Sequence, residues 1–504
     1  MSTPTFTDTI GENHADAIER ATADLAIEHW IDGGSSSSAD GETFQTADPA
    51  VADPITTIAR GDTDDIDSAV AAARSAFDRE WRETTPQERS QYVHEWTAEL
   101  RNHLDELTLL ESLDTGKPLA YARDELTEAL EQFEYYVAVA QAHEGSQIPQ
   151  GADNHIYTRS EPYGVSGQIL PWNYPLSLFG WKTGAALAAG NTVVCKPSEE
   201  APLSITRAAQ LSEGILPDGV LNVVNGYGEE AGAALTDHAG VDKLSFTGSV
   251  PVGREVMAAG ADHVTPVTLE LGGKSPYVVF PDADIEQAAE TSASGIFYNT
   301  GQSCDACSRV LVHEDVHDEF VDAFVKAAEA WEPGDPLADG TTMGPLTFDD
   351  QHEKVSNYVD VGRKEGAELV LGGDDGTGSD DGYFFEPTVF DDVDNDMRIA
   401  QEEIFGPVQC IITFADYEEA IELANDVEYG LASGVATRDA STAHRAAAEI
   451  EAGSVWINEY HGGGVGIPFG GYKASGIGRE CGKDTLDEYT RTKSVNVALD
   501  DPLS

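Results

Sequence analysis

From about residue 163 onward, short β-branched runs alternate with segments of helical spacing, and this alternation limits the folds open to the chain. Residues 192–195 and 220–224 are two such runs, and the segment between them has the spacing of a helix. Strands that alternate with helices of this length predict a parallel sheet covered on both faces. A second series begins at residues 277–280, so we expect two α/β domains joined at the Gly272-Gly273 pair.

The flanking segments carry different patterns. Residues 63–145 are expected to be helical, because apolar residues recur there at intervals of mostly three or four. Residues 372–382 are rich in glycine and aspartate and are expected to form a surface loop. Residues 494–499 alternate as a short strand, which we expect to complete a sheet elsewhere, in this chain or in another subunit.

Acidic residues dominate the charge of the chain. Among 504 residues, Asp and Glu account for 91 and Lys and Arg for 29, so the formal net charge is −62. A surface this negative repels phosphate, which excludes nucleic acid and disfavours anionic membranes as partners. Such self-repulsion destabilises a compact fold, but molar salt shortens the screening length to about 3 Å. We therefore expect a halophile's cytoplasm with molar salt; an acidic protein of an ordinary cytoplasm is the alternative.

The sequence predicts neither a membrane span nor secretion. It contains no stretch of 18 apolar residues, and residues 1–26 lack the basic start and apolar segment of a signal peptide. The five cysteines are an odd number in a large chain, which favours reduced thiols. A cytoplasmic protein is expected.

Two residues carry groups suited to covalent catalysis. Cys304 follows a glycine-bounded turn, where backbone N–H groups can lower the pKa of the thiol and raise its thiolate fraction. Glu270 ends an apolar strand, where burial can raise the pKa of the carboxyl and suit it to act as a general base. Taken singly, each also fits a structural role, Cys304 as an inert thiol and Glu270 as a helix cap or solvated strand end.

Three further motifs can bind anions or nucleotides. Asn173, in Pro171-Trp172-Asn173-Tyr174-Pro175, can donate to an oxyanion. Lys196-Pro197-Ser198-Glu199 follows a predicted strand, where ligands bind in open α/β sheets and an acid can hold ribose hydroxyls. Phe246-Thr247-Gly248-Ser249 runs from a strand into a helix whose first N–H groups suit a phosphate. Each motif alone is also an ordinary turn.

The order of seven motifs along the chain is more specific than any one of them. The motifs are Pro-Trp-Asn at 171–173, Lys-Pro-Ser-Glu at 196–199, Phe-Thr-Gly-Ser at 246–249, Glu-Leu-Gly-Gly-Lys at 270–274, Gly-Gln-x-Cys at 301–304, Glu-Glu-Ile-Phe-Gly-Pro at 402–407 and Pro-Phe-Gly-Gly-Tyr-Lys-x-Ser-Gly at 468–476. In this order they resemble the NAD(P)-dependent aldehyde dehydrogenase superfamily, over about residues 27–497. Seven motifs in the same order make chance agreement negligible.

The resemblance implies oxidation of an aldehyde to the carboxylic acid. The matching nucleophile is Cys304, and the oxyanion would be held by the amide of Asn173 and the backbone N–H of Cys304. Water activated by Glu270 would release the acid from a thioester. Lys182 matches an amine near the catalytic core. Members that transfer the acyl group to coenzyme A generally lack this glutamate, so Glu270 favours hydrolysis.

The resemblance also implies a dinucleotide cofactor and no metal. The matching cofactor-binding residues are Trp172, Lys196, Glu199, Gly248, Ser249, Glu403 and Phe405. Lys196 and Glu199 match residues that hold the adenosine ribose, and Ser249 matches a pyrophosphate contact. Glu403 and Phe405 match residues that position the nicotinamide ribose and ring. A carboxylate at Glu199 repels a 2′-phosphate, so NAD is favoured, with NADP as the alternative.

The aldehyde itself is the least determined part of the function. Tyr174, Trp181, Tyr298 and Phe469 match positions that line the aldehyde tunnel. Four aromatic rings can hold a quaternary ammonium, as in betaine aldehyde dehydrogenases, so betaine aldehyde or an aminoaldehyde is one hypothesis. Other aliphatic or aromatic aldehydes are alternatives. Succinate semialdehyde is disfavoured because no arginine pair is obvious in a tunnel motif.

One residue departs from the family pattern Cys-x-Ala-Gly-Ser-Arg. Cys307 replaces the glycine and forms a C-x-x-C pair with Cys304. A reversible disulfide is one hypothesis and a packed, inert thiol is the other, whereas a single pair does not make a zinc site. Two other functions are therefore weighed: a thiol-disulfide oxidoreductase that uses Cys304 and Cys307, and a non-catalytic structural or binding protein with the same fold.

The fold class implied is α/β, with a Rossmann-like cofactor domain, an α/β catalytic domain and a small β projection that pairs subunits. We expect the cofactor domain at residues 1–143 and 162–271 and the catalytic domain at residues 272–485. The projection is expected at residues 144–161 and 486–504. A homodimer or homotetramer is expected.

Overall fold

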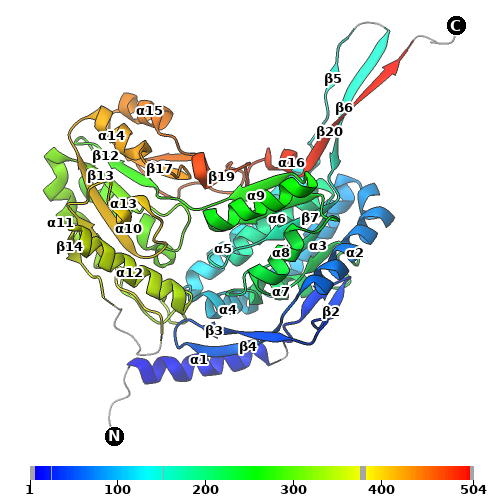
Figure 1. Cartoon of the computed structure of the whole chain (residues 1–504), viewed down its shortest axis with the longest axis horizontal. Helices are drawn as coiled ribbons and strands as arrows, with labels where there is room; N and C mark the ends of the chain where they lie inside the picture. Colours follow the sequence, from blue (N-terminus) through cyan, green and yellow to red (C-terminus); the bar gives the residue numbers. More distant parts are fainter. Residues whose placement is uncertain (1–5, 24, 151–152, 375–381, 500–504) are drawn as a thin grey trace.

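A computed structural model of the chain describes residues 6–23, 25–150, 153–374 and 382–499, with side chains from residue 13 onward. Within these ranges the strands form two large sheets, a three-stranded sheet and a two-stranded ribbon (Figure 1). The predicted loop at 372–382 falls mostly on residues 375–381, which lie outside the described residues.

The first large sheet has eight strands among the described residues. Its described strands are β1 (His29–Ile31), β2 (Gly34–Ser36), β7 (Val165–Ile169), β8 (Thr192–Lys196), β9 (Leu221–Val223), β10 (Lys243–Thr247), β11 (Val267–Glu270) and β19 (Gly476–Ile477). They lie in the order β19-β11-β10-β7-β8-β9-β1-β2. The strands from β11 to β9 run parallel, whereas β19, β1 and β2 are antiparallel to their neighbours.

Helices cover both faces of this sheet. They are α2 (Thr63–Arg79), α3 (Pro86–Asn102), α4 (Leu104–Thr115), α5 (Leu119–Ala140), α6 (Pro175–Ala189), α7 (Leu203–Gln210), α8 (Ala233–Thr236) and α9 (Val250–His263), with short turns η1 (Trp81–Glu83) and η2 (Gly228–Gly232). Side chains alternate across a strand. On β8, Val193 and Cys195 belong to one apolar core and Val194 to another, so both faces are buried.

The second large sheet carries the other half of the molecule. Its described strands are β12 (Pro276–Val279), β13 (Arg309–His313), β14 (Glu368–Leu371), β15 (Thr388–Asp391), β16 (Val408–Phe414), β17 (Ala432–Ala436) and β18 (Ser454–Ile457), in the order β14-β15-β16-β13-β12-β17-β18. All neighbours are parallel except β14 and β15. On β12, Val278 faces one core and Tyr277 and Val279 face the other. This sheet is therefore also covered on both sides.

The helices of this half are α10 (Ile285–Phe297), α11 (His317–Ala328), α12 (Asp349–Glu365), α13 (Arg398–Gln401), α14 (Tyr417–Asn425) and α15 (Ala440–Glu449), with short turns η3 (Tyr298–Gly301), η4 (Glu314–Val316) and η5 (Lys473–Ser475). After β18 the chain returns to the first sheet, where β19 pairs with β11 and α16 (Thr485–Glu488) packs against α6. The last motif of the sequence is thereby brought to the end of β11, next to Glu270.

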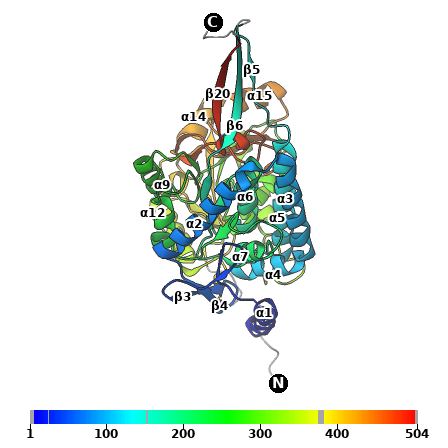
Figure 2. The same ribbon diagram turned by 90° about the vertical axis from the view of Figure 1, so that its right-hand side faces the viewer.

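A three-stranded arm projects from the body, as Figures 1 and 2 both show. It consists of β5 (Gln147–Ile148), β6 (Asn154–Pro162) and β20 (Thr490–Ala498), in the order β20-β6-β5. The terminal strand was expected to complete a sheet elsewhere, and its partner is β6 of the same chain. The two strands pair antiparallel from Thr490 opposite Pro162 to Ala498 opposite Asn154. The far edge of β20 has no partner strand in the described part of the chain.

The N-terminal segment wraps the base of the molecule (Figure 1). It contains α1 (Phe6–Thr22) and the ribbon of β3 (Thr43–Asp48) and β4 (Asp53–Ala59). Through the described ranges, no helix combines the length and the apolar character that crossing a bilayer requires.

Candidate active site

Cys304 lies in a tight loop that follows α10. The chain leaves the helix through Asn299 and Thr300, whose φ angles are 49° and 57°, and through Gly301 at 72°. A Cβ on Gly301 would lie 2.1 Å from the carbonyl oxygen of Gly406, so the close approach of two backbones requires glycine there. This left-handed turn fixes the position at which the thiol is presented.

The side chain of Gln302 holds this loop from within. Its amide nitrogen donates to the carbonyl of Asn299 at 3.2 Å, and its amide oxygen accepts from the backbone N–H of Thr347 at 3.0 Å. Gln302 is 1% exposed. The glutamine of the Gly-Gln-x-Cys motif therefore braces the loop that carries the nucleophile.

The surroundings of Cys304 raise the pKa of its thiol, contrary to the lowered pKa expected from the turn. Loss of solvation on burial is the largest cause, and the nearby carboxyls of Asp305, Glu270 and Glu403 add to it. A hydrogen bond from the Asp305 backbone opposes the rise but is the smaller effect. The sequence reasoning counted the N–H groups of the turn and missed the carboxyls that the fold gathers around the thiol.

Glu270 is the last residue of β11 and is 3% exposed. Neither of its carboxyl oxygens has a hydrogen-bond partner among the described residues. Burial raises the pKa of this carboxyl well above its usual range, and the charge of Glu480 raises it further, as the strand-end position predicted. A Cβ on Gly470 would lie 2.8 Å from Oε1 of Glu270, so glycine leaves room beside the carboxyl.

Lys182, on α6, is held in a buried polar cluster near Glu270. Its ammonium donates to the carboxylate of Glu480 at 2.6 Å and to the hydroxyl of Ser245 at 3.1 Å. Thr268 donates to the same hydroxyl at 3.0 Å. Lys182 and Glu480 are 0% and 1% exposed, so the ion pair is shielded from solvent. The charges of both residues act on the pKa of Glu270.

Asn173 lies immediately before α6 and is 5% exposed. Its side-chain nitrogen donates to the carbonyl of Gln302 at 2.9 Å. Its own carbonyl accepts from the side chain of Asn299 at 3.2 Å. Asn173 is therefore bonded directly to the loop that carries Cys304, and the second proton of its amide remains for a substrate oxygen.

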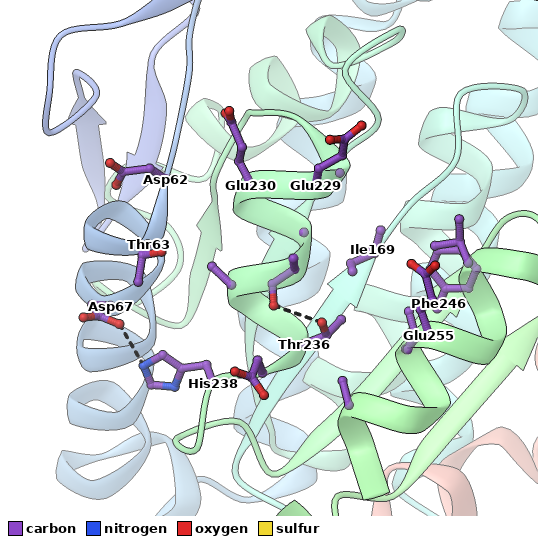
Figure 3. A pocket seen from close by; sticks show the side chains of 18 of the residues that line it. Asp62, Thr63, Asp67, Ile169, Glu229, Glu230, Thr236, His238, Phe246 and Glu255 are labelled. Carbon is purple, nitrogen blue, oxygen red and sulfur yellow. Dashed lines mark hydrogen bonds and ion pairs between the residues drawn. The ribbon is translucent and has the colours of Figure 1, made fainter. Parts of the chain in front are cut away.

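A cavity of about 1470 Å³ opens beside the ends of β7 and β10 (Figure 3). Ile169, the last residue of β7, and Phe246 on β10 contribute apolar surface, and Val256 on α9 adds to it. The other wall comes from η2 and α8. Ligands of open α/β sheets bind at such strand ends, and the volume and the apolar slot suit a dinucleotide.

Glu199 lines this cavity, and Lys196 is paired with it. The Lys196 ammonium donates to Oε2 of Glu199 at 2.6 Å, while Oε1 accepts from the backbone N–H of Gly228 at 3.4 Å. Burial raises the pKa of Glu199, but the charge of Lys196 and the hydrogen bonds from Lys196 and the backbone together outweigh burial, so the net pKa is lowered. An ionised carboxylate beside an ammonium can accept from ribose hydroxyls.

The rim of the cavity is strongly acidic. Figure 3 shows Asp62, Glu229 and Glu230 near one end and Glu255 on α9 across the opening. Arg60 is a cation of this rim, and its Nε donates to Glu230 at 2.8 Å. The rim therefore repels the phosphates of a dinucleotide unless salt screens it.

Gly248 and Ser249 join β10 to α9. Ser249 precedes the first helical residue, and its side chain makes no capping hydrogen bond. A Cβ on Gly248 would lie 2.5 Å from the ring of Phe246, so glycine lets the chain pass close to this ring. The start of α9 is the place at which the motif predicts an anion, although Pro251 in its first turn has no N–H group to offer.

Residues from both halves of the molecule meet where Trp172, before α6, contacts Phe405, which follows α13 together with Glu403. The rings of Trp172 and Phe405 meet edge to face, with centroids 5.2 Å apart. Glu403 accepts from the backbone N–H of Gly273 at 2.9 Å, and burial raises the pKa of its carboxyl. A Cβ on Gly272 would lie 2.4 Å from the Glu403 oxygens, which explains the glycine pair at this junction.

Of the four predicted tunnel aromatics, Trp181 and Phe469 form a ring pair, whereas Tyr174 and Tyr298 contact other residues. Tyr174 bonds through its hydroxyl to Ser303, one residue before Cys304. Trp181 and Phe469 meet edge to face at 5.4 Å. Tyr298 packs against the ring of Tyr121 at 4.7 Å. Its hydroxyl donates to the Glu125 carboxylate at 3.2 Å.

Comparison with known proteins agrees with this geometry. The family model for the aldehyde dehydrogenase family matches residues 36–495. An aldehyde dehydrogenase of Emericella nidulans is 45% identical over 466 residues, covering 92% of this chain and 93% of its own. The benzaldehyde dehydrogenase of Antirrhinum majus is 46% identical over 477 residues, covering 94% and 89%.

Solved structures give the same result. The NAD+ complex of the Bacillus cereus aldehyde dehydrogenase superposes with a TM-score of 0.93 at 45% identity, covering 95% of this chain and 98% of its own. A Staphylococcus aureus betaine aldehyde dehydrogenase bound to NAD+ superposes with a TM-score of 0.94 at 38% identity, covering 96% and 97%. The chain belongs to the aldehyde dehydrogenase family. Its fold is the aldehyde dehydrogenase fold.

The structure of this aldehyde dehydrogenase also brings in residues that the sequence reasoning did not select. Glu480 contacts Lys182, and Lys117 and Glu125 lie behind Asn173. Lys354, on α12, interacts electrostatically with the carboxyl of Glu403. These residues stand at no motif spacing that relates them to the nucleophile, and only their burial as charged groups distinguishes them.

Cys307, the departure from the family pattern, is 0% exposed and belongs to the apolar core of the second sheet. Burial raises the pKa of its thiol well above the usual range. Its backbone N–H donates to the carbonyl of Gly295, and a Cβ on that glycine would lie 2.9 Å from Cβ of Cys307. This environment fits the packed, inert thiol. Among the described residues, no cluster of three or more His, Cys, Asp or Glu side chains is placed to hold a metal ion.

Proposed function

We propose that this aldehyde dehydrogenase converts an aldehyde, NAD+ and water into the carboxylic acid, NADH and a proton, with Cys304 as the nucleophile. The observation that carries the proposal is the hydrogen bond from the Asn173 side chain to Gln302, in the loop that presents Cys304. Glu270 acts electrostatically on the same thiol. A nucleophile, an oxyanion donor and a base thus share one site.

The first step is the attack of Cys304 on the aldehyde. The thiol must lose its proton to solvent before attack, and its raised pKa means that this loss is favoured at higher pH. The sulfur then forms a bond to the carbonyl carbon while the π electrons move to oxygen. The free amide proton of Asn173 and the backbone N–H of Cys304 stabilise this oxyanion.

Release of the acid requires the carboxyl of Glu270 as a base. Glu270 takes a proton from water, and the hydroxyl attacks the thioester carbon, so the carbon–sulfur bond breaks and the thiolate leaves. Because both Glu270 oxygens lack partners in the described protein, either is free to hold this water. The Lys182 and Glu480 pair tunes the pKa at which Glu270 does so.

The cavity residues fit NAD+ as the cofactor. Lys196 and Glu199 would hold the adenosine ribose, the start of α9 at Ser249 the pyrophosphate, and Glu403 the second ribose. When bound, NAD+ supplies the hydride acceptor that turns the thiohemiacetal into a thioester. The ionised Glu199 and the acidic rim both disfavour a 2′-phosphate, so we propose NAD as the preferred cofactor over NADP.

The environment of the substrate residues favours a cationic aldehyde, betaine aldehyde or an aminoaldehyde. The Tyr298 hydroxyl is bonded to the carboxylate of Glu125, and the charges of Glu125 and Asp305 both act on Tyr174. Aromatic rings attract a cation over a neutral or anionic group. Because Lys117 already pairs with Glu125, the preference rests on the rings and on Asp305. Neutral aliphatic and aromatic aldehydes are the competing substrates.

The proposal also includes the oligomeric state, the division into domains and the salt content of the cytoplasm. The three-stranded arm, with its free β20 edge and exposed Val497, would pair subunits as a homodimer or homotetramer. The division into cofactor, catalytic and arm segments at residues 143, 162, 271 and 485 is proposed with it. The net charge of −62 supports a cytoplasm with molar salt.

The test is NADH formation in about 2–3 M KCl from betaine aldehyde, propanal, benzaldehyde and succinate semialdehyde, with Cys304→Ala in parallel. Turnover that the variant abolishes is expected, with the cationic aldehyde preferred. Reduction of insulin disulfides in place of aldehyde oxidation would instead support the thiol-disulfide alternative. Folded protein with no turnover on any aldehyde would support the non-catalytic alternative.

A further inference from the structure

A lysine lies fully buried directly behind the oxyanion donor. Lys117 follows α4 in the Gly116-Lys117-Pro118 segment and is 0% exposed at its side chain. Its ammonium donates to the main-chain carbonyl of Asn173 at 2.9 Å and also to the carboxylate of Glu125 on α5. Nothing in the proposed chemistry of Cys304 and Glu270 uses this lysine.

Two contacts fix the direction of the Lys117 ammonium. The face of the Tyr174 ring lies 4.4 Å from Nζ, at cation–π distance. The second oxygen of Glu125 accepts from the hydroxyl of Tyr298 at 3.2 Å. The lysine is therefore held between two residues of the predicted aldehyde tunnel, with its remaining donor aimed at Asn173.

Two side chains donate hydrogen bonds to the main-chain carbonyl of Asn173. Lys117 donates to it from one side, and the side chain of Asn299 donates to it at 3.2 Å from the loop before Cys304. Its side-chain nitrogen is fixed to the carbonyl of Gln302 at 2.9 Å. Backbone and side chain of Asn173 are thus both immobilised, which is what a donor aimed at a developing charge requires.

We propose that Lys117 is a positioning residue for the oxyanion site, because the ammonium, oriented by Glu125, fixes the Asn173 main chain and thereby the direction of its free amide proton. The proposal rests on the proposed function of Cys304 and Asn173. Lys117 touches neither substrate nor cofactor in this assignment and acts through Asn173.

The competing explanation is that Lys117 serves stability alone. A buried ion pair gives little net stability compared with apolar residues of the same volume, because both ions lose their hydration. A buried ammonium needs acceptors for its N–H groups in either explanation. The donation to the Asn173 carbonyl is the contact through which Lys117 can act on the oxyanion site, and kinetics must separate the two roles.

A double-mutant cycle separates the two explanations. Lys117→Met, Asn173→Ala and the double variant are compared by the rate of the first NADH burst at saturating aldehyde. Displacing a positioned donor slows a reaction roughly 10- to 100-fold, so Lys117→Met alone is expected to lose about that factor. In the Asn173→Ala background, removing Lys117 is expected to change the burst rate less than twofold. The proposal would be overturned if Lys117→Met slowed the burst by the same factor in the wild-type and Asn173→Ala backgrounds. It would also be overturned if Lys117→Met did not slow the burst at all.

Two control measurements test whether Lys117→Met alters the fold or the reactivity of the Cys304 thiol instead of the position of Asn173. Alkylation of Cys304 by iodoacetamide needs no oxyanion donor, so Lys117→Met is expected to retain the wild-type alkylation rate, with Cys304→Ala as the blank. The matched control is Lys364→Met, since Lys364 is 75% exposed and paired only at the surface with Asp360. Its burst rate is expected to equal that of the wild type. A parallel loss of alkylation in Lys117→Met would overturn the assignment to positioning.

A conservative variant covers the case in which Lys117→Met does not fold. Glu125→Gln keeps one acceptor oxygen for the Lys117 ammonium, replaces the oxygen that accepts from Tyr298 by an NH2 donor, and removes the charge that orients Lys117. It is expected to slow the burst in the wild-type background and to leave Asn173→Ala unchanged; equal slowing in both overturns the proposal. If the wild type forms no NADH from any aldehyde, the proposed function itself fails, which this cycle distinguishes from a failure of Lys117 alone.

Discussion

The Lys182 ammonium and the Glu480 carboxylate lie 2.6 Å apart, both buried, and both act on the pKa of Glu270. The chain separates these two residues by almost three hundred positions. Their pairing places a polar but nearly neutral unit beside a carboxyl that burial strongly favours in its protonated form. The pKa of the carboxyl proposed as the base is therefore tuned by the charges of Lys182 and Glu480.

Removal of the Glu270 carboxylate is expected to separate the two half-reactions. Glu270→Gln should preserve a first burst of NADH and then stall, because attack on the aldehyde can still occur while the water for deacylation lacks its base. Stopped-flow absorbance of NADH measures both phases. Equal loss of the burst and of steady turnover would contradict a deacylation role.

Glu480→Gln is expected to move the pH dependence of acid release to lower pH. Burial is the main reason that the pKa of Glu270 is raised, and the negative charge of Glu480 is the second. Neutralising Glu480 removes that second cause, so Glu270 ionises at lower pH and deacylation begins there. The measurement is steady-state turnover against pH; an unshifted profile would remove Glu480 from this role.

Asp305→Asn is expected to make the nucleophile more reactive at neutral pH. After burial, the carboxylate of Asp305 is the largest contribution to the raised pKa of Cys304. Without it the thiolate fraction rises several-fold, and alkylation by iodoacetamide accelerates accordingly. The pH profile of labelling checks this, with Cys304→Ala as the blank; an unchanged profile in a folded variant counts against it.

Glu199→Gln is expected to improve the use of NADP relative to NAD. The carboxylate of Glu199, kept ionised by Lys196, repels a 2′-phosphate, and an amide removes that charge while keeping an acceptor. The ratio of kcat/KM for the two cofactors should shift toward NADP by about tenfold, the effect of roughly 1.4 kcal/mol. An unchanged ratio would refute the assignment of this residue to the ribose.

Salt is expected to lower the KM for NAD as well as to stabilise the fold. The cofactor cavity carries Glu229, Glu230 and Glu255 at its rim, and these carboxylates repel a dinucleotide phosphate unless they are screened. KM for NAD measured between about 0.2 and 2 M KCl should fall several-fold. Glu255→Gln should show a weaker salt dependence than the wild type, and identical slopes would exclude a contribution from the rim.

His14 links stability to alkaline pH. Burial lowers the pKa of this histidine, but the carboxylates of Asp335 and Asp48 outweigh burial and raise the pKa to about 9. The protonated His14 stabilises the fold fully below pH 6.5, the pKa of histidine in the unfolded chain. This stabilisation is lost as the pH rises through about 9, the pKa in the folded protein. The shift corresponds to on the order of 3 kcal/mol.

This linkage is measured by unfolding at fixed salt between pH 6 and 10, with His14→Asn as the control. The wild type should lose stability across this interval, because Asp48 and Asp335 are left facing each other without a cation. The variant should start lower and show a flatter profile. A wild-type profile as flat as that of the variant would exclude the histidine as the source.

Much of the site could be predicted before the structure was known. Cys304, Glu270, Asn173 and the Lys196–Glu199 pair stand in local motifs whose turns and strand ends are written in the sequence, so their surroundings follow from nearby residues. The alternation of strands and helices also predicted two covered parallel sheets, which the alternating cores of β8 and β12 show. These features depend on short-range pattern, which a single sequence carries.

The prediction that failed depended on distance in space. The thiol of Cys304 was expected to have a lowered pKa from its turn, yet the fold gathers Asp305, Glu270 and Glu403 around it and raises that pKa. The pairing of the C-terminal strand with residues 154–162 instead agrees with the expectation that this strand and residues 144–161 share one projection. The pKa of Cys304 does not follow from spacing, because it depends on which distant segments the fold brings together.

The sequence by itself thus determined the family and indicated the residues proposed as nucleophile, base and cofactor pair, because each stands in a motif of neighbouring residues. Only the tertiary structure decided how those groups are charged and aimed. Glu480 reaches Lys182, and Lys117 reaches the carbonyl of Asn173, across long stretches of chain. The physical reason is that burial and electrostatics act through space, so the pKa of a carboxyl and the direction of a donor are properties of the folded interior.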